Sequence, residues 1–205
     1  MSAKAMQQQP RKYPRIHTSL RAVAGAAALV AALAAPAAAQ QMALMASFPL
    51  AGREARSAAD LLRSRDLLIP VQGVAFGQLR DTYSHARSGG RVHDAIDIHA
   101  PRGTPVLAVN DGAVIKLHSG ARGGIALYQL DTDGRTRYYY AHLDRYADGI
   151  WEGVPVKKGQ VIGYVGDTGN AQPGDHHLHF SIAILSNASR WWGGTNVNPY
   201  DVFRR

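Results

Sequence analysis

The sequence predicts a mainly β fold, a compact antiparallel β-sheet domain, and three observations support this prediction. After Pro70 the chain contains short segments rich in Val, Ile, Leu and Tyr, with few helical windows. Its 21 glycines and 10 prolines lie mostly after Leu50, which favours short strands joined by tight turns. Asp131-Thr-Asp-Gly134 separates two such segments, and Asp-Gly accepts the positive φ of a hairpin turn.

Six strands are expected within this domain. They are Thr104–Val109, Ala113–Leu117, Gly124–Leu130, Arg135–His142, Gln160–Val165 and His177–Leu185. Their apolar residues are expected to form the core, namely Val106, Val109, Val114, Ile115, Ile125, Leu127, Val161, Ile162, Val165, Phe180 and Ile182.

Composition limits the classes of function. The 205 residues are 46% hydrophobic and 19% charged, which is typical of a globular chain with a substantial core. Cysteine is absent, so His and carboxylate side chains must hold any metal. The net charge of +8 includes five bases and no acid between Met1 and Arg21, and the rest of the chain has 18 bases and 15 acids. No Lys/Arg-rich run remains there, so no nucleic-acid partner is expected.

The N-terminus has the pattern of a secretory signal. A basic stretch ends at Arg21, an apolar run follows over Ala22–Ala35, and Ala37-Ala-Ala39 offers an Ala-x-Ala cleavage site. We therefore expect a signal peptide over 1–39 and no stable membrane span after its cleavage, with an uncleaved anchor as the alternative. A helical lead-in or linker over 40–67 is expected next, because Ala51 to Leu68 has helical spacing of apolar residues, and the folded domain is expected over 68–205.

Eight of the nine histidines follow residue 84, and their spacing is the main chemical signal. On a straight strand His93 and Asp97 would lie about 13 Å apart, so they can share a metal only if the chain bends near Ala95. His177 and His179 alternate with two apolar residues and are expected on one face, either exposed to solvent or binding something. Tyr138, Tyr140 and His142 are likewise expected to share a face, where packing is the alternative to chemistry.

Two histidines and one carboxylate with an open position have the composition of a catalytic zinc site. The same donor set also suits non-haem iron, which keeps a small barrel oxygenase as an alternative.

Seven ordered blocks over roughly residues 70 to 200 resemble the LytM/lysostaphin-type zinc endopeptidases of bacterial cell walls. The blocks are His93-x-x-x-Asp97, Gly103-Thr-Pro-Val-Leu-Ala108, Gly112-Ala-Val-Ile115, Tyr140-Ala-His142-Leu143, Lys158-Gly-Gln-Val-Ile-Gly163, Gly166-Asp-Thr-Gly-Asn170 and His177-Leu-His179-Phe180, with Asn198-Pro199 near the end. Two departures are Ala95, where the family usually has glycine, and the additional histidine His176.

This resemblance implies a β-sheet groove with zinc at its floor. It implies one Zn2+ per chain held by His93, Asp97 and His179. His142 and His177 are implied as two catalytic histidines that do not bind the metal. One acts on the zinc-activated water and the other on the oxyanion, and which histidine has which role stays open. Tyr83 is implied as an oxyanion donor, with a surface tyrosine as the alternative.

The implied function is zinc-dependent hydrolysis of peptide bonds in peptidoglycan, outside the inner membrane in the periplasm or at the cell wall. The alternative is a non-catalytic LytM-like module that binds peptidoglycan or activates an amidase, and cell-wall regulatory partners suit either function. The remaining histidines of the domain, namely His85, His99, His118 and His176, are expected on the surface or in loops. Trp191-Trp192 is expected either to line the groove or to pack at its rim.

Overall fold

A computed structural model describes residues 57–187 and 190–204, which lie within one compact unit. The predicted signal peptide over 1–39 and the first part of the predicted helix fall outside these residues. Among the residues that are described, no helix is long and apolar enough to span a membrane.

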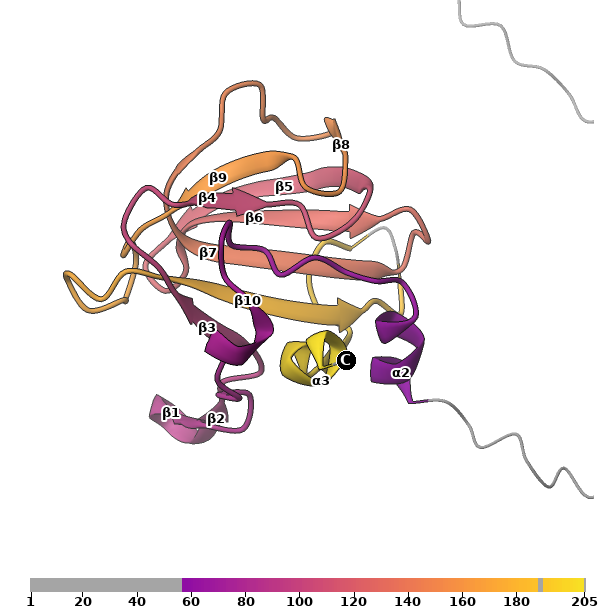
Figure 1. The fold of residues 1–205 in the computed structure, drawn as a ribbon, viewed down its shortest axis with the longest axis horizontal. Coiled ribbons are helices and arrows are strands. Elements are labelled where there is room, and N and C mark those ends of the chain that lie inside the picture. Colours follow the sequence, from indigo (N-terminus) through magenta and orange to yellow (C-terminus); the bar gives the residue numbers. More distant parts are fainter. Residues whose placement is uncertain (1–56, 188–189, 205) are drawn as a thin grey trace, which may run out of the picture. The chain divides into compact units, whose positions relative to one another are not determined.

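An antiparallel β-sheet forms the centre of this unit, which confirms the predicted fold class (Figure 1). The strands are β1 (Ala86–Arg87), β2 (Arg91–Val92), β3 (Ile96–His99), β4 (Pro105–Leu107), β5 (Gly112–Gly120), β6 (Gly124–Asp131), β7 (Thr136–Tyr146), β8 (Pro155–Val156), β9 (Val161–Val165), β10 (His177–Ile184) and β11 (Thr195–Val197). The helices are α2 (Ala58–Arg63) and α3 (Pro199–Phe203), with 3-10 turns at Phe76–Gln78 and Ser88–Gly90.

The order of strands explains how distant residues meet. The main path is β11-β10-β7-β6-β5-β8, and β9 pairs with both β7 and β4. The first half of β10 pairs with β3, so His179 lies opposite Asp97 although they are far apart in sequence. The hairpin β1–β2 forms a separate two-stranded sheet immediately before β3.

All six predicted strands are present with shifted ends, and β4 is the most shortened of them. The sequence did not predict β1, β2, β3, β8 and β11, because two to four residues are too few to show a period. The predicted helix is also shorter in the described part of the chain, where α2 begins after the capping residue Ser57. Leu62 of α2 is buried, so this helix is packed on the domain rather than solvated.

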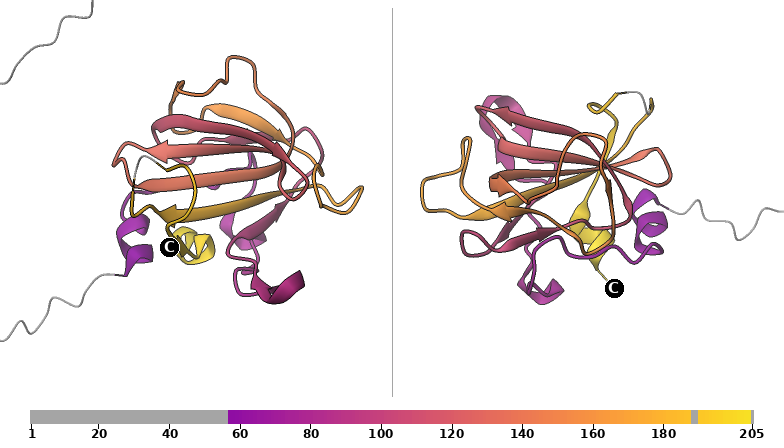
Figure 2. Two further views of the ribbon diagram at one scale, coloured as in Figure 1. Left: turned by 180° about the vertical axis from the view of Figure 1, so that it is seen from behind. Right: turned by 90° about the horizontal axis from the view of Figure 1, so that it is seen from above.

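Helices α2 and α3 lie side by side next to the C-terminal end of β10, as the reverse and top views also show (Figure 2). The Arg63 guanidinium donates to the Asp201 carbonyl through Nη2 at 2.8 Å, which joins the two helices.

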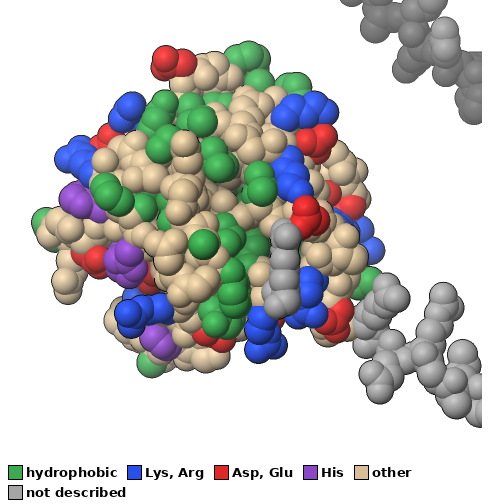
Figure 3. All heavy atoms as spheres, viewed as in Figure 1, with side chains coloured by type: hydrophobic (Ala, Val, Ile, Leu, Met, Phe, Trp, Pro, Cys, Tyr) green, Lys and Arg blue, Asp and Glu red, His purple; other side chains and the backbone are tan. Residues whose placement is uncertain are grey.

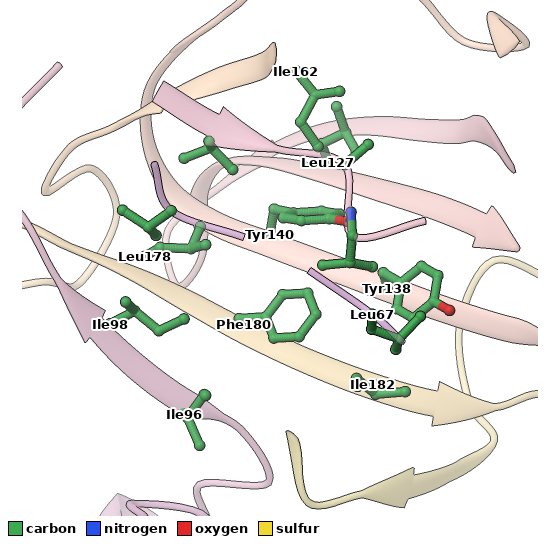
Figure 4. Close-up of a cluster of buried hydrophobic side chains, with 14 of the residues drawn as sticks. Leu67, Ile96, Ile98, Leu127, Tyr138, Tyr140, Ile162, Leu178, Phe180 and Ile182 are labelled. Atoms are coloured by element: carbon green, nitrogen blue, oxygen red, sulfur yellow. The ribbon is translucent and has the colours of Figure 1, made fainter. Parts of the chain in front are cut away.

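Most of the predicted core is buried on one face of the sheet (Figure 4). The confirmed members are Val106, Val109, Val114, Leu127, Ile162, Val165, Phe180 and Ile182. Ile115, Ile125 and Val161 are only half-buried. Val114 and Ile115 are adjacent in β5, and the pairing with β6 shifts register between Val114 and Lys116, so Ile115 lies at a bulge while Val114 enters the core.

The core also includes two tyrosines that the sequence analysis did not place there. Tyr138 and Tyr140 are fully buried. The Tyr140 hydroxyl donates to Gln129 Oε1 at 2.6 Å, and the Tyr138 hydroxyl donates to Asp131 Oδ2 at 2.5 Å. These partners satisfy the polar atoms that burial would otherwise leave without a hydrogen bond.

The predicted hairpin turn after β6 depends on Asp133. Gly134 has φ of 68°, as expected for Asp-Gly. Asp133 Oδ1 accepts from the amides of Arg135 and Thr136, both at 2.7 Å, and Arg65 Nη1 lies 2.8 Å from Oδ2. Burial alone would raise the pKa of Asp133, but these hydrogen bonds outweigh it and lower the pKa to about 2.

We expect Asp133→Ala to lower the free energy of unfolding by about 1–2 kcal/mol at pH 7, because it removes several hydrogen bonds to a partly exposed charge. The folded pKa lies below the unfolded value of about 3.9, so this stability is present above pH 4 and is lost as the pH falls through about 2. Urea unfolding between pH 2 and pH 7 measures the effect. The exposed Asp148, which forms no ion pair in the described chain, provides the control variant Asp148→Ala; equal losses in both variants would contradict this account.

Candidate active site

Three predicted ligand residues meet where β3 pairs with β10. His93 Nε2 lies 3.0 Å from Asp97 Oδ1, and His179 Nδ1 lies 3.2 Å from the same oxygen. The two histidine nitrogens are 3.0 Å apart. The lone pairs of these three atoms repel one another at such distances unless a proton or a cation lies between them. Two imidazole nitrogens and one carboxylate oxygen are a donor set that suits zinc.

A left-handed residue brings His93 back toward Asp97. The bend lies at Asp94, with φ of 56°, one residue before the expected position at Ala95. Asp94 N donates to Tyr83 O and His93 N donates to His85 O, so the preceding loop fixes the bend. Ala95 is fully buried and has no positive φ, so the glycine usual in the family is not required there.

Neighbouring groups orient two of the three candidate ligands. His93 Nδ1 donates to the Thr82 carbonyl at 3.0 Å, which leaves the lone pair of Nε2 facing the cluster. Arg87 Nη2 lies 2.7 Å from Asp97 Oδ2, so only Oδ1 of the carboxylate faces the histidines.

Burial and the contacts within this cluster shift the pKa values of Asp97 and His179. Burial would raise the pKa of Asp97, but its close contacts with His179 and His93 outweigh burial and hold that pKa far below its usual range. Burial lowers the pKa of His179 in spite of the neighbouring Asp97. An ionised carboxylate next to a neutral imidazole is the state in which both bind a metal.

His142 and His177 lie beside this cluster, with their ring centroids 5.0 Å apart. Each uses Nδ1 to donate to a backbone carbonyl, His142 to Thr168 at 2.7 Å and His177 to Asp175 at 2.8 Å. Nε2 of each ring therefore has a free lone pair. Burial, together with repulsion from the other histidines, lowers the pKa of His142 to about 4.

The strand pattern predicted one pair of histidines correctly and misplaced His142. His177 and His179 both line the groove, while Leu178 and Phe180 are fully buried in the core. Tyr138 and Tyr140 do not share a face with His142, because His142 has φ of 60° and the pairing of β6 with β7 contains a bulge. This irregularity turns His142 into the groove beside Tyr139.

The five candidate residues line one groove with a volume of about 500 Å³. Tyr139 and the arginines Arg87, Arg91 and Arg122 also line it, and the sequence analysis missed all four. A hairpin of two-residue strands and a turn bring these arginines to the groove, so no periodic signal identifies them.

Several other expected residues lie outside the groove lining. Tyr83 is absent from it and its side chain hydrogen-bonds Asp94, so its position does not support an oxyanion role. Trp191 packs against Tyr128, and Trp192 is 54% exposed, so rim packing is the better description of this pair. His85, His99 and His118 are exposed and His176 is half-buried, in agreement with the expected surface or loop positions.

The loop that holds His142 packs closely against the start of β6. A Cβ at Gly169 would lie 2.2 Å from Gly124 N and 2.4 Å from Arg122 O, and Gly169 has φ of 79°. The neighbouring Thr168 accepts the hydrogen bond from His142. Glycine is therefore required at position 169 by both space and backbone conformation.

We expect Gly169→Ala to destabilise the domain by about 2–3 kcal/mol and to lower activity by displacing Thr168. Gly149→Ala is the matched control, because Gly149 has φ of 76° but no atom within 4 Å of an added Cβ. The control should lose only about 1 kcal/mol of stability, the usual penalty of positive φ. Chemical denaturation measures the free energy of unfolding of both variants. Equal losses of stability would show that the close packing of Gly169 against the start of β6 contributes nothing.

A β-sheet groove with a His/Asp/His cluster has the donor set of metal-dependent hydrolases, and comparison with known proteins identifies the family. The profile of Peptidase family M23 matches residues 91–199, over half of the chain. The chain belongs to this peptidase family, whose members are metallopeptidases.

Individual relatives agree with this assignment. The L-Ala–D-Glu endopeptidase of Bacillus subtilis is 34% identical over 132 residues, covering 61% of this chain and 39% of that protein. The DD-carboxypeptidase/endopeptidase Mpg of Neisseria meningitidis serogroup B is 36% identical over 113 residues, covering 55% of this chain and 23% of that protein. The chain therefore spans well under half the length of these relatives.

The catalytic domain of lysostaphin from Staphylococcus simulans has a similar solved structure, with a TM-score of 0.50 and 27% identity. The match covers 71% of this chain and 97% of that domain. The similarity therefore extends over nearly all of a known catalytic domain.

Proposed function

We propose that this chain is a zinc-dependent endopeptidase that hydrolyses peptide bonds in bacterial peptidoglycan. The observation that carries the proposal is the convergence of His93, Asp97 and His179 within 3.0–3.2 Å of one another, beside two further histidines in the same groove. The activities for which the relatives are named, those of an L-Ala–D-Glu endopeptidase and a DD-carboxypeptidase/endopeptidase, support the same substrate.

The donor atoms proposed for one Zn2+ per chain are His93 Nε2, Asp97 Oδ1 and His179 Nδ1. When bound, zinc supplies Lewis-acid chemistry, since it polarises a carbonyl oxygen and lowers the pKa of a water molecule toward 7. Arg87 keeps the second oxygen of Asp97 occupied, so the carboxylate contributes a single donor atom.

His177 is the proposed proton acceptor. Its Nε2 has a lone pair toward the groove and lies 3.9 Å from Asp97 Oδ1. The positive charge that His177 acquires on taking a proton lies near the Asp175 carboxylate, 3.7 Å from Nδ1. These two carboxylates stabilise the imidazolium, which can then donate the proton to the leaving amine.

His142 has a different proposed role. Its pKa of about 4 makes it neutral at pH 7, and its Nδ1 proton is already donated to Thr168. Nε2 of His142 therefore acts as a hydrogen-bond acceptor that orients the attacking water or the amine of the substrate.

Export to the periplasm or the cell wall is proposed from the basic and apolar pattern of residues 1–39. Peptidoglycan lies outside the inner membrane, so export brings the peptidase to its substrate.

Digestion of purified peptidoglycan by the exported protein tests the proposal. We expect new peptide ends, identified by mass spectrometry, that disappear with a zinc chelator and return when zinc is added. About one zinc per chain is expected by elemental analysis. If the zinc-containing protein binds peptidoglycan but produces no new peptide ends, the result would contradict the proposed peptidase activity and favour a binding module.

A further inference from the structure

The groove is lined by three arginines from two separate loops. Arg87 and Arg91 belong to the β1–β2 hairpin, and Arg122 lies in the turn between β5 and β6. In the face shown in Figure 3, histidine side chains lie along the left edge with Lys/Arg side chains beside them, and further Lys/Arg side chains lie on the right. A groove lined by arginines attracts negative charge.

The three arginines differ in what they contact. Arg87 is committed to the candidate ligand Asp97, with Nη2 and Oδ2 2.7 Å apart. Arg91 bonds only to Ser88, from Nε to the carbonyl at 3.2 Å and from Nη2 to the hydroxyl at 3.4 Å. The Arg122 guanidinium has no hydrogen bond or ion pair with any residue that the structure describes, so it is free for a ligand.

The acidic residues of the groove do not neutralise Arg91 or Arg122. Only Asp97 and Asp175 are acidic among the described lining residues. Asp97 is bonded to Arg87 and to the histidine cluster, and Asp175 Oδ1 lies 3.2 Å from His99 Nε2. Two guanidinium groups therefore face the groove with no carboxylate partner from this chain.

The backbones of Arg91 and Arg122 adjoin residues of the proposed active site. The neighbour of Arg122, Gly123, accepts a hydrogen bond from His142 N at 2.8 Å. Arg91 precedes the candidate ligand His93 by two residues. Both guanidinium groups line the same groove as the five histidine and aspartate side chains, so a substrate group bound to either would lie in the groove where the bond is cut. A carboxylate matches the planar fork of arginine.

We propose that Arg122, assisted by Arg91, selects a peptide with a free carboxylate beside the scissile bond over a neutral peptide such as oligoglycine. This inference rests on the proposed function, because it names the class of substrate for the same groove. The carboxylate of the substrate forms an ion pair with the Arg122 guanidinium, and the peptide is thereby aligned across the histidines.

Two matched peptides test the selection. Fluorescein-labelled L-Ala–γ-D-Glu–L-Lys–D-Ala carries a free α-carboxylate on D-Glu, and its partner carries a carboxamide at that position. Fluorescence anisotropy with the zinc-loaded protein gives the Kd of each, and kcat/KM gives the same ratio where the peptide is cut. We expect the carboxylate peptide to be favoured by roughly tenfold or more, as for a charge-assisted hydrogen bond.

Arg122→Gln is expected to remove most of this preference, and Arg91→Gln a smaller part. The matched control is Arg135→Gln, which removes one exposed arginine at the other end of β7, about 20 Å from His142 along the strand. A ratio near one in the unmodified protein, or a preference that survives both groove substitutions, would overturn the inference. Selective binding that depends on Arg122 without cleavage of either peptide supports the inference and counts against the proposed peptidase activity alone.

Discussion

Asp97→Ala is expected to abolish zinc binding and peptidoglycan cleavage together. Asp97 Oδ1 lies within 3.2 Å of both histidine donor atoms, and its low pKa keeps it ionised at neutral pH. Without it, two imidazoles remain with no negative charge to offset the cation. Zinc affinity should fall by more than about 100-fold, since loss of a residue that only supports a ligand already costs 10–100-fold.

Elemental analysis after dialysis measures the zinc, and mass spectrometry of digested peptidoglycan measures the activity. His176→Ala is the matched control, because His176 adjoins the motif but pairs with Asp167, outside the groove lining. The control should retain about one zinc and full activity. An Asp97→Ala protein that folds, binds no zinc and still cuts would rule out the proposed metal chemistry.

His177→Ala is expected to retain zinc and to lower kcat by about 10²–10⁴, the usual contribution of a general acid–base group. The His177 side chain is not one of the proposed zinc ligands, and its Nε2 is the atom proposed to accept the proton. A quenched peptide substrate gives kcat and KM, and elemental analysis confirms metal content.

His99→Ala is the matched control for this variant. His99 packs against His177, with ring centroids 5.3 Å apart, but it is exposed and does not line the groove. Its loss should change kcat by only a few-fold. Wild-type turnover by His177→Ala would show that another group accepts the proton.

Regular secondary structure made part of the site predictable. His177 and His179 face the groove because β10 is a regular strand with continuous pairing to β3, so the alternation of side chains holds. The same rule failed for His142, whose positive φ and adjacent bulge interrupt the alternation. No pattern of residue types reveals a bulge of this kind.

Contacts made by loops were not predictable from spacing. On a straight strand His93 and Asp97 would be too far apart, and only the left-handed conformation of Asp94 brings their side-chain atoms to 3.0 Å. The arginines of the groove depend on a hairpin of two-residue strands and on a turn. Their positions follow from tertiary packing rather than from local sequence. The ligand roles of His93, Asp97 and His179 stay a prediction that the zinc measurement tests.

The contact between Arg87 and Asp97 has a consequence for coordination chemistry. Because the guanidinium occupies Oδ2, Asp97 would offer only Oδ1 to a cation held between the histidines. With His93 and His179 the protein would then supply three single donor atoms, as in catalytic zinc sites that keep a position open for water or substrate. An exposed residue of the β1–β2 hairpin would thus set the number of oxygens that Asp97 can offer to a metal, and with it the room for a substrate oxygen.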